Sequence, residues 1–120
     1  MTRRPQFLEP RPNVKRVSAS AACTLMLRSD ILIFDVRDAQ SYAQAHILGA
    51  QHLCDANMYQ VLTSHERNRP VLIYCYHGNM SQTVAQMLID FAFREVYSMD
   101  GGFESWRQAV APSAPAPAEA

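Results

Sequence analysis

The sequence is poor in lysine and has no long apolar run, and each shortage excludes a class of protein. Lys15 is the only lysine, and the eleven basic residues balance eleven acidic ones, so the formal net charge is zero. Such a chain has no overall attraction for nucleic acid or an anionic membrane surface. Its longest apolar runs, such as 31–34 and 71–74, are far shorter than the roughly 18 residues of a membrane span. The sequence therefore predicts neither a nucleic-acid partner nor a membrane partner.

Cysteine is also scarce. Cys23, Cys54 and Cys75 make an odd number, and none forms a CxxC pair or a His/Cys cluster with metal-ligand spacing. The N-terminal stretch MTRRPQFLEPRPNVKR is basic but lacks the apolar core of a secretory signal. We therefore expect free thiols in a reducing compartment, a cytoplasmic location and no metal site.

Length and composition predict one domain between two tails. The 120 residues, 48% of them hydrophobic, are enough for one real core. Residues 1–13 contain three prolines and are predicted to be a flexible N-terminal extension. Residues 111–120, APSAPAPAEA, are predicted to be a disordered Pro/Ala tail. The folded domain is then expected over residues 14–110.

Within this domain, short apolar runs alternate with helical patterns. Strands are expected within VKRVS, DILIFDVR, AQHL, PVLIYC and EVYSMD. Helices are expected from Ser18 or Ser20 to about Arg28, over 38–46 with Asp38 as N-cap, over 55–64 with Asp55 as cap, over 79–91 and over 103–110. Strands separated by helices predict an α/β fold with a central parallel sheet and helices on both faces. In such sheets, sites form at the carboxyl ends of strands.

The segment YCYHGNMSQ, residues 74–82, places Cys75 between a strand and a helix. A tight loop there directs backbone N–H groups inward, and the helix N-terminus adds positive partial charge. Both effects favour the thiolate, so we predict a depressed pKa for Cys75. Gly78 and Asn79 tolerate a left-handed backbone, and Ser81 can donate its hydroxyl to an anion. Alternatively, Cys75 is a buried core cysteine beside an ordinary loop, and this stretch alone does not separate the two interpretations.

The charge of the loop narrows the chemistry. Cysteine phosphatases and arsenate reductases need an arginine six positions after the cysteine, where this chain has Ser81, and residues 76–93 contain no Lys or Arg. Phosphoryl transfer without a clamp for its charge is disfavoured. A disulfide oxidoreductase would need a resolving cysteine in the loop, which is lacking. The remaining prediction is a thiolate that accepts sulfane sulfur and holds the persulfide among neutral amides.

Three motifs in the right order resemble the rhodanese-like sulfurtransferases, most closely the short single-domain thiosulfate sulfurtransferases of the GlpE type. They are DVRDAQSYAQAHILGAQHL (35–53), CYHGNMS (75–81) and YSMDGGFESW (97–106). The resemblance spans about residues 14–109 and implies a single rhodanese-like α/β domain that needs no cofactor. It implies that Cys75 is the nucleophile and persulfide carrier. The substrate-binding loop would comprise Tyr76, His77, Gly78, Asn79, Met80 and Ser81.

The reaction implied by the resemblance is a double displacement. The Cys75 thiolate attacks the outer sulfur of thiosulfate or another sulfane-sulfur donor, and the persulfide passes sulfur to cyanide or to a dithiol acceptor such as thioredoxin. The loop departs from the family pattern at Met80, where serine is usual, and at Gln82 and Thr83, where relatives often carry lysine. Its lack of charge favours an alternative, a protein-to-protein sulfur-relay or docking module with low activity on free thiosulfate.

Four residues outside the loop have two interpretations each. Arg37 ends a strand expected beside that of Cys75 and either supplies the missing positive charge or forms a structural ion pair with a nearby carboxylate. Cys23 and Cys54 are expected to be packing residues, with Cys54 the better candidate for a resolving thiol. Asp100 is expected to be a helix cap rather than a neighbour of the active loop.

Overall fold

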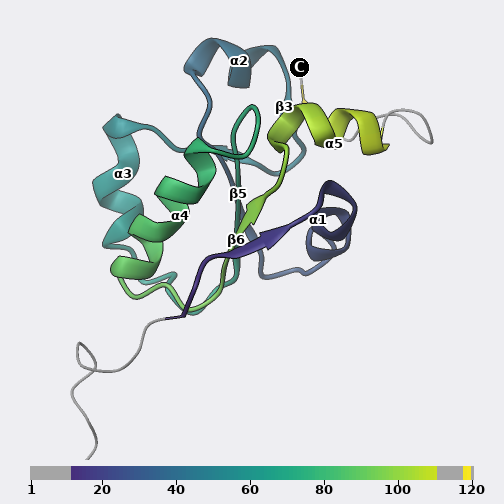
Figure 1. The fold of residues 1–120 in the computed structure, drawn as a ribbon. Helices are drawn as coiled ribbons and strands as arrows, with labels where there is room; N and C mark the ends of the chain where they lie inside the picture. The colour runs from purple at the N-terminus through teal and green to yellow at the C-terminus, as the bar shows by residue number, and fades with distance from the viewer. Residues whose placement is uncertain (1–11, 111–117, 120) are drawn as a thin grey trace, which may run out of the picture.

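Five parallel strands form the centre of the structure, a computed structural model that describes residues 12–110 and 118–119 (Figure 1). In the order β1-β6-β5-β2-β4 across the sheet, they are β1 (Lys15–Val17), β6 (Val96–Met99), β5 (Val71–Tyr74), β2 (Leu32–Asp35) and β4 (Gln51–His52). The helices are α1 (Ala19–Leu25), α2 (Ala39–Gln44), α3 (Asp55–Leu62), α4 (Met80–Asp90) and α5 (Gly102–Val110). The predicted α/β fold is confirmed.

The structure describes only two residues of each predicted tail. The predicted flexible extension, 1–13, lies outside the described residues except at 12 and 13, and the predicted tail, 111–120, except at 118 and 119. That last pair forms strand β7 (Ala118–Glu119), which pairs antiparallel with β3 (His46–Ile47). The elements from β1 to α5 cover residues 15–110.

Side chains alternate between the two faces of the sheet, with α3 and α4 on one face and α1 and α5 on the other; Figure 1 shows this arrangement of the helices. On one face Phe34 and Ile73 belong to a core completed by residues of α3 and α4. On the other face Leu72 and Met99 belong to a core completed by residues of α1 and α5, including the fully buried Trp106. Burial on both faces explains why the central strands read as continuous apolar runs.

Among the first three helices, two start at a cap expected from the sequence. The side chain of Ser18 accepts a hydrogen bond from the backbone of α1, and that of Asp38 does the same for α2, so both predicted caps are confirmed. The predicted cap Asp55 is wrong: it is the first helical residue of α3, and the N-cap is Cys54. Cys54 has the extended backbone of an N-cap, and its N–H donates to Asn57 Oδ1 at 2.8 Å.

The direction in which successive strands are added to the sheet reverses between β2 and β5, although the strands themselves stay parallel. From β2 the chain moves outward to the edge strand β4, then returns to place β5 on the other side of β2. Connections diverge at such a reversal and leave a crevice outside the carboxyl ends of the two strands. Asp35 at the end of β2 pairs with Tyr74 at the end of β5. Arg37 and Cys75 therefore follow adjacent strand ends, as expected from the sequence.

The first residues of α5 lie directly against the loop that begins at Cys75. The N–H of Phe103 donates to Cys75 O at 2.8 Å, and the N–H of Glu104 donates to Tyr76 O at 3.3 Å. This approach requires Gly102, whose φ is +60° and whose missing Cβ would lie 2.4 Å from Cys75 O. The glycine thus fixes the start of α5 and the backbone of the loop together.

We expect Gly102→Ala to destabilise the protein far more than Gly49→Ala. Gly49 also has a positive φ, of +87°, but nothing lies within 4 Å of its missing Cβ. Gly49→Ala should therefore lower the free energy of unfolding only by the backbone strain, about 1–2 kcal/mol. Gly102→Ala adds a clash with backbone atoms and should lower it by about 3 kcal/mol or more. Urea unfolding of both variants measures this, and equal losses would contradict it.

Candidate active site

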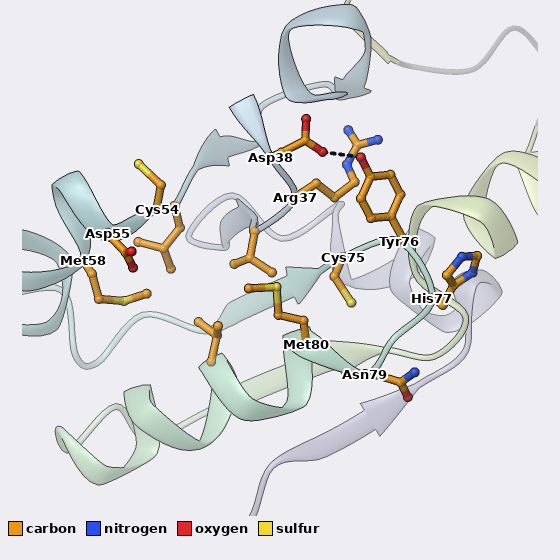
Figure 2. Close-up of a pocket in the computed structure, with 13 residues that line it drawn as sticks. Arg37, Asp38, Cys54, Asp55, Met58, Cys75, Tyr76, His77, Asn79 and Met80 are labelled. Carbon is orange, nitrogen blue, oxygen red and sulfur yellow. Dashed lines mark hydrogen bonds between the residues drawn. The ribbon is translucent and has the colours of Figure 1, made fainter. Parts of the chain in front are cut away.

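A pocket of about 540 Å³ opens at the carboxyl ends of β2 and β5 (Figure 2). It lies between the residues that follow β2, the start of α3, the loop after β5 and the first turns of α4. Its lining residues are Val36, Arg37, Asp38, Leu53, Cys54, Asp55, Met58, Cys75, Tyr76, His77, Asn79, Met80 and Val84. Of the seven residues predicted for the nucleophile and its loop, five line this pocket. A sixth, Ser81, contacts Cys75 through its hydroxyl. The seventh, Gly78, donates to Cys75 from the backbone.

The Cys75 sulfur lies in a cradle of hydrogen-bond donors. Its Sγ accepts from the N–H of Gly78 at 3.2 Å and from the N–H of Ser81 at 3.3 Å, and the Ser81 hydroxyl oxygen lies 3.4 Å away. Gly78 makes this possible with a φ of +94°. Asn79, predicted to share the left-handed conformation, instead has a φ of −91° and is the N-cap of α4. One left-handed residue is therefore enough to direct both N–H groups inward.

Two opposing effects set the acidity of Cys75. Burial to 4% exposure would by itself raise the pKa of the thiol. Hydrogen bonds from the Ser81 hydroxyl and from the N–H groups of Ser81, Gly78 and His77 outweigh it, and the pKa of Cys75 falls below the ordinary thiol value. The predicted direction is confirmed. Cys75 is also part of the apolar core. It is therefore both a buried core cysteine and an acidified thiol, two interpretations that the sequence had left as alternatives.

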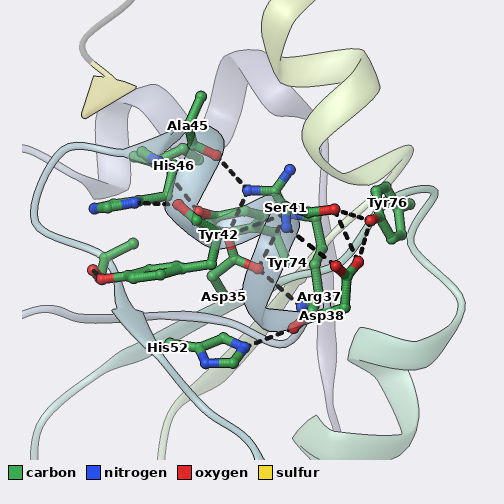
Figure 3. Close-up of polar contacts among 12 residues, drawn as sticks. Asp35, Arg37, Asp38, Ser41, Tyr42, Ala45, His46, His52, Tyr74 and Tyr76 are labelled. Atoms are coloured by element: carbon green, nitrogen blue, oxygen red, sulfur yellow. Dashed lines mark hydrogen bonds and ion pairs between the residues drawn. The ribbon is translucent and has the colours of Figure 1, made fainter. Parts of the chain in front are cut away.

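Arg37 forms the structural ion pair that was its alternative interpretation (Figure 3). Its Nη2 donates to Asp35 Oδ2 at 2.7 Å, and both side chains are almost fully buried. The same nitrogen donates to Ala45 O at 2.6 Å, and the guanidinium lies 4.0 Å from the centre of the Phe103 ring. Because Asp35 neutralises this charge, Arg37 lines the pocket as half of an ion pair. Its role as charge support for the loop stays a prediction.

A second polar group ties the loop to the start of α2. The Tyr76 hydroxyl donates to the Asp38 carboxylate and contacts the Ser41 hydroxyl (Figures 2 and 3). Hydrogen bonds from Tyr76 and Ser41 hold the pKa of Asp38 well below its usual range. Asp38 is therefore a full carboxylate at the edge of the pocket, and the exposed Asp55 adds a second one.

The other cysteines and Asp100 have separate places. Cys54 lines the same pocket as Cys75, whereas the partly buried Cys23 packs against the core on the opposite face of the sheet. The predicted helix cap Asp100 is wrong: α5 begins at Gly102, so Gly101 directly precedes the helix, and Asp100, the residue just after β6, pairs with Arg16 at 2.8 Å. Within the described residues no group of three or more His, Cys, Asp or Glu side chains could hold a metal ion.

Sequence reasoning missed the apolar wall of the pocket and one buried hydroxyl. Leu53 follows β4, Met58 lies in α3 and Val84 lies in α4, and no local pattern unites them. Ser98 lies fully buried on β6 with its Oγ 2.8 Å from Ser81 Oγ. A sign was available in the strand VYSM, where residues 96 and 98 point to the same face and a serine interrupts the apolar pattern.

A parallel sheet with a cysteine cradle at the carboxyl ends of its strands is the arrangement expected of a rhodanese-like domain, and similarity to known proteins agrees with it. Residues 18–109 match the rhodanese-like domain family, and the chain belongs to that family. It is 46% identical over 93 residues to a thiosulfate sulfurtransferase GlpE of Coxiella burnetii, which covers 78% of this chain and 87% of that protein. A GlpE of Vibrio cholerae is 43% identical over 96 residues, covering 80% and 91%.

The solved structures support the fold. The crystal structure of the Alr3790 protein from Anabaena sp. superposes with a TM-score of 0.72 at 22% identity, covering 86% of this chain and 81% of that one. A thiosulfate sulfurtransferase from Pseudomonas aeruginosa gives 0.71 at 18% identity, covering 92% of this chain but 20% of that one. Among the helices in the described ranges, none is long and apolar enough to cross a membrane.

We expect Ser81→Ala to raise the pKa of Cys75. The substitution removes the hydroxyl but keeps the backbone N–H, so the thiolate loses one donor. The rate of alkylation by iodoacetamide should reach its half-maximum at a higher pH, and at pH 7 it should fall by roughly threefold to tenfold. Ser20→Ala, at an exposed position of α1, is the control and should match the wild type. An unchanged pH profile in Ser81→Ala would contradict the cradle.

Proposed function

We propose that this chain is a thiosulfate sulfurtransferase that carries sulfane sulfur on Cys75. The observation that carries the proposal is the Cys75 Sγ held by two backbone N–H groups beside a hydroxyl. These donors favour an anionic sulfur, which both the thiolate and the persulfide present. The names of the relatives from Coxiella burnetii and Vibrio cholerae support thiosulfate as the donor.

In the first half-reaction the Cys75 thiolate attacks the outer sulfur of thiosulfate. A bond forms between Sγ and that sulfur, the S–S bond of thiosulfate breaks, and sulfite leaves with the electron pair. The product is a Cys75 persulfide with its negative charge on the outer sulfur. The N–H groups of Gly78 and Ser81 and the start of α4 stabilise negative charge at this place throughout the exchange.

In the second half-reaction an acceptor takes the outer sulfur and restores the thiolate. Cyanide would take the sulfur and leave as thiocyanate. A dithiol such as reduced thioredoxin would take the sulfur as a persulfide; its second thiol would then attack the inner sulfur, close a disulfide and release the outer sulfur as hydrosulfide. A cytoplasmic location belongs to this proposal, because Cys23, Cys54 and Cys75 are free thiols.

One observation favours a second candidate, a protein-to-protein sulfur relay with low activity on free thiosulfate. Arg37 is the one Lys or Arg among the described residues that line the pocket, and Asp35 neutralises it. A dianionic donor thus meets no Lys or Arg side chain without a carboxylate partner among the described lining residues. Slow turnover of thiosulfate and cyanide, with fast sulfur exchange from a persulfidated partner protein, would favour the relay.

The intact mass after incubation with thiosulfate tests the proposal. We expect the wild type to gain one sulfur atom and Cys75→Ala to gain none. Cys23→Ala is the matched control, since Cys23 packs against the opposite core, and it should gain sulfur like the wild type. The proposal fails if the wild type stays unmodified or if Cys75→Ala gains sulfur equally well.

A further inference from the structure

Two buried serine hydroxyls form a chain that ends at the Cys75 sulfur. Ser98 Oγ lies 2.8 Å from Ser81 Oγ, which lies 3.4 Å from Cys75 Sγ. Both serines are fully buried, and neither belongs to the lining of the pocket. The hydroxyl chain therefore reaches the sulfur from inside the protein, while a substrate would reach it from the pocket.

Ser98 occupies a position on β6 where the surroundings favour an apolar side chain. Strand β6 lies between β1 and β5 in the sheet, and Ser98 points to the same face as Val96, which belongs to the core against α4. A hydroxyl in such a place costs free energy unless it has a hydrogen-bond partner. Among the described residues, Ser81 is the single hydrogen-bond partner of the Ser98 hydroxyl. That partner is also the hydroxyl that contacts the nucleophile.

We infer that Ser98 is a positioning residue that directs the Ser81 hydroxyl toward the Cys75 sulfur. The inference rests on the proposed function in taking Cys75 as the nucleophile. Ser98 lies outside the pocket lining and acts through Ser81.

The direction of the chain follows from its protons. Each serine has one hydroxyl proton to donate. The Ser98 proton points to the Ser81 oxygen, so the Ser81 proton is directed at Sγ, beside the N–H groups of Gly78 and Ser81 that already bind it. The opposite direction, from a thiol through Ser81 to Ser98, leaves the buried Ser98 proton without an acceptor among the described residues. The direction that ends with a donor on the sulfur is therefore the one that satisfies both hydroxyls.

A donor on the sulfur stabilises the thiolate more than the thiol, because a hydrogen bond to a charged acceptor is stronger than one to a neutral acceptor. Burial raises the pKa of Cys75, and among the hydrogen bonds that lower it the one from the Ser81 hydroxyl has the largest effect. Ser98 thus favours loss of the Cys75 proton without changing its own charge.

Removal of Ser98 should weaken the Ser81 donor without abolishing it. The Ser81 hydroxyl would then be restrained by one contact of 3.4 Å to sulfur, and the strengthening of one hydrogen bond by the next along the chain would be lost. The effect on Cys75 should therefore be part of the effect of removing the Ser81 hydroxyl itself.

The titratable and charged groups around Cys75 are unchanged in a variant of Ser98. Those of the pocket lining are Asp38, Cys54, Asp55, Tyr76, His77 and Arg37, the last paired with Asp35. Near the loop, β6 is followed by Asp100 and α5 carries Glu104, each paired with an arginine. Helix α4 has no titratable side chain before Asp90. A shift in the acidity of Cys75 in such a variant therefore reports the hydroxyl chain.

The pH profile of Cys75 alkylation by iodoacetamide tests this role. The reaction is followed at Cys75 by peptide mass, since Cys23 and Cys54 are also free thiols. In Ser98→Ala the half-maximal pH should rise and the rate at pH 7 should fall by roughly twofold to threefold, less than in Ser81→Ala. An unchanged profile in Ser98→Ala would overturn the inference.

Two variants of equal size separate the hydroxyl from the space that the side chain fills. Ser98→Thr and Ser98→Val place the same shape at a fully buried position, so strain from the larger side chain is common to both. Ser98→Thr keeps the hydroxyl and should react roughly twofold to threefold faster than Ser98→Val at pH 7. Equal profiles in the two variants would show a purely structural serine, which affects the free energy of unfolding alone.

The double variant shows whether Ser98 acts through Ser81. Ser98→Ala should cause no further rise in the half-maximal pH when Ser81 is already alanine, and effects that add in full would overturn the inference. These measurements use no sulfur donor. The proposed function is judged separately, by whether thiosulfate leaves a sulfur atom on Cys75, so failure of one is distinguishable from failure of the other.

Discussion

The hydrogen bonds from the Gly78 and Ser81 N–H groups to Cys75 Sγ are the contacts on which the rest of the site depends. They exist only while the chain makes a left-handed step at Gly78 and starts α4 at Met80. The other side of that loop is fixed by α5, whose first N–H groups bind the carbonyl groups of Cys75 and Tyr76. The start of α4 and the loop before it therefore hold the sulfur, and the start of α5 holds the backbone of the residue that carries it. Gly102, the first residue of α5, and Gly78 in the loop serve the same geometry.

The electrostatics of the site follow from the choice of neutral donors. Backbone amides and hydroxyls stabilise a single negative charge on sulfur without a counter-ion that would bind the product tightly. The strong cation nearby, Arg37, is instead used to join β2 to the segment around Ala45 and to pack against Phe103. Removing that charge from the pocket leaves the carboxylates of Asp38 and Asp55 to set its character.

Much of the fold and of the cysteine loop could be predicted from the sequence, and the features that were missed have physical causes. The buried strands around Ile33 and Leu72 are continuous apolar runs, and the caps Ser18 and Asp38 obey local chemistry, so they were predictable. Cys54 was missed as a cap because Asp55 beside it is the more usual residue there. The two roles of Arg37 could not be separated, since its partner is decided by where Asp35 and Ala45 meet in space. The apolar wall could not be predicted because Leu53 and Met58 meet Val84 of α4 only in the folded chain.

The buried position of Ser81 disfavours phosphate chemistry at this site. Phosphatases of this general design place an arginine there, and its guanidinium must reach the pocket to hold an oxyanion. Ser81 is fully buried between Cys75 and Ser98, on the helix face that packs against the sheet with Val84 and Leu88. A guanidinium starting from that point would enter an apolar core with no carboxylate to pair with it, at a large cost in free energy. The backbone that holds a sulfur anion so closely thus excludes the side chain that a phosphate would require.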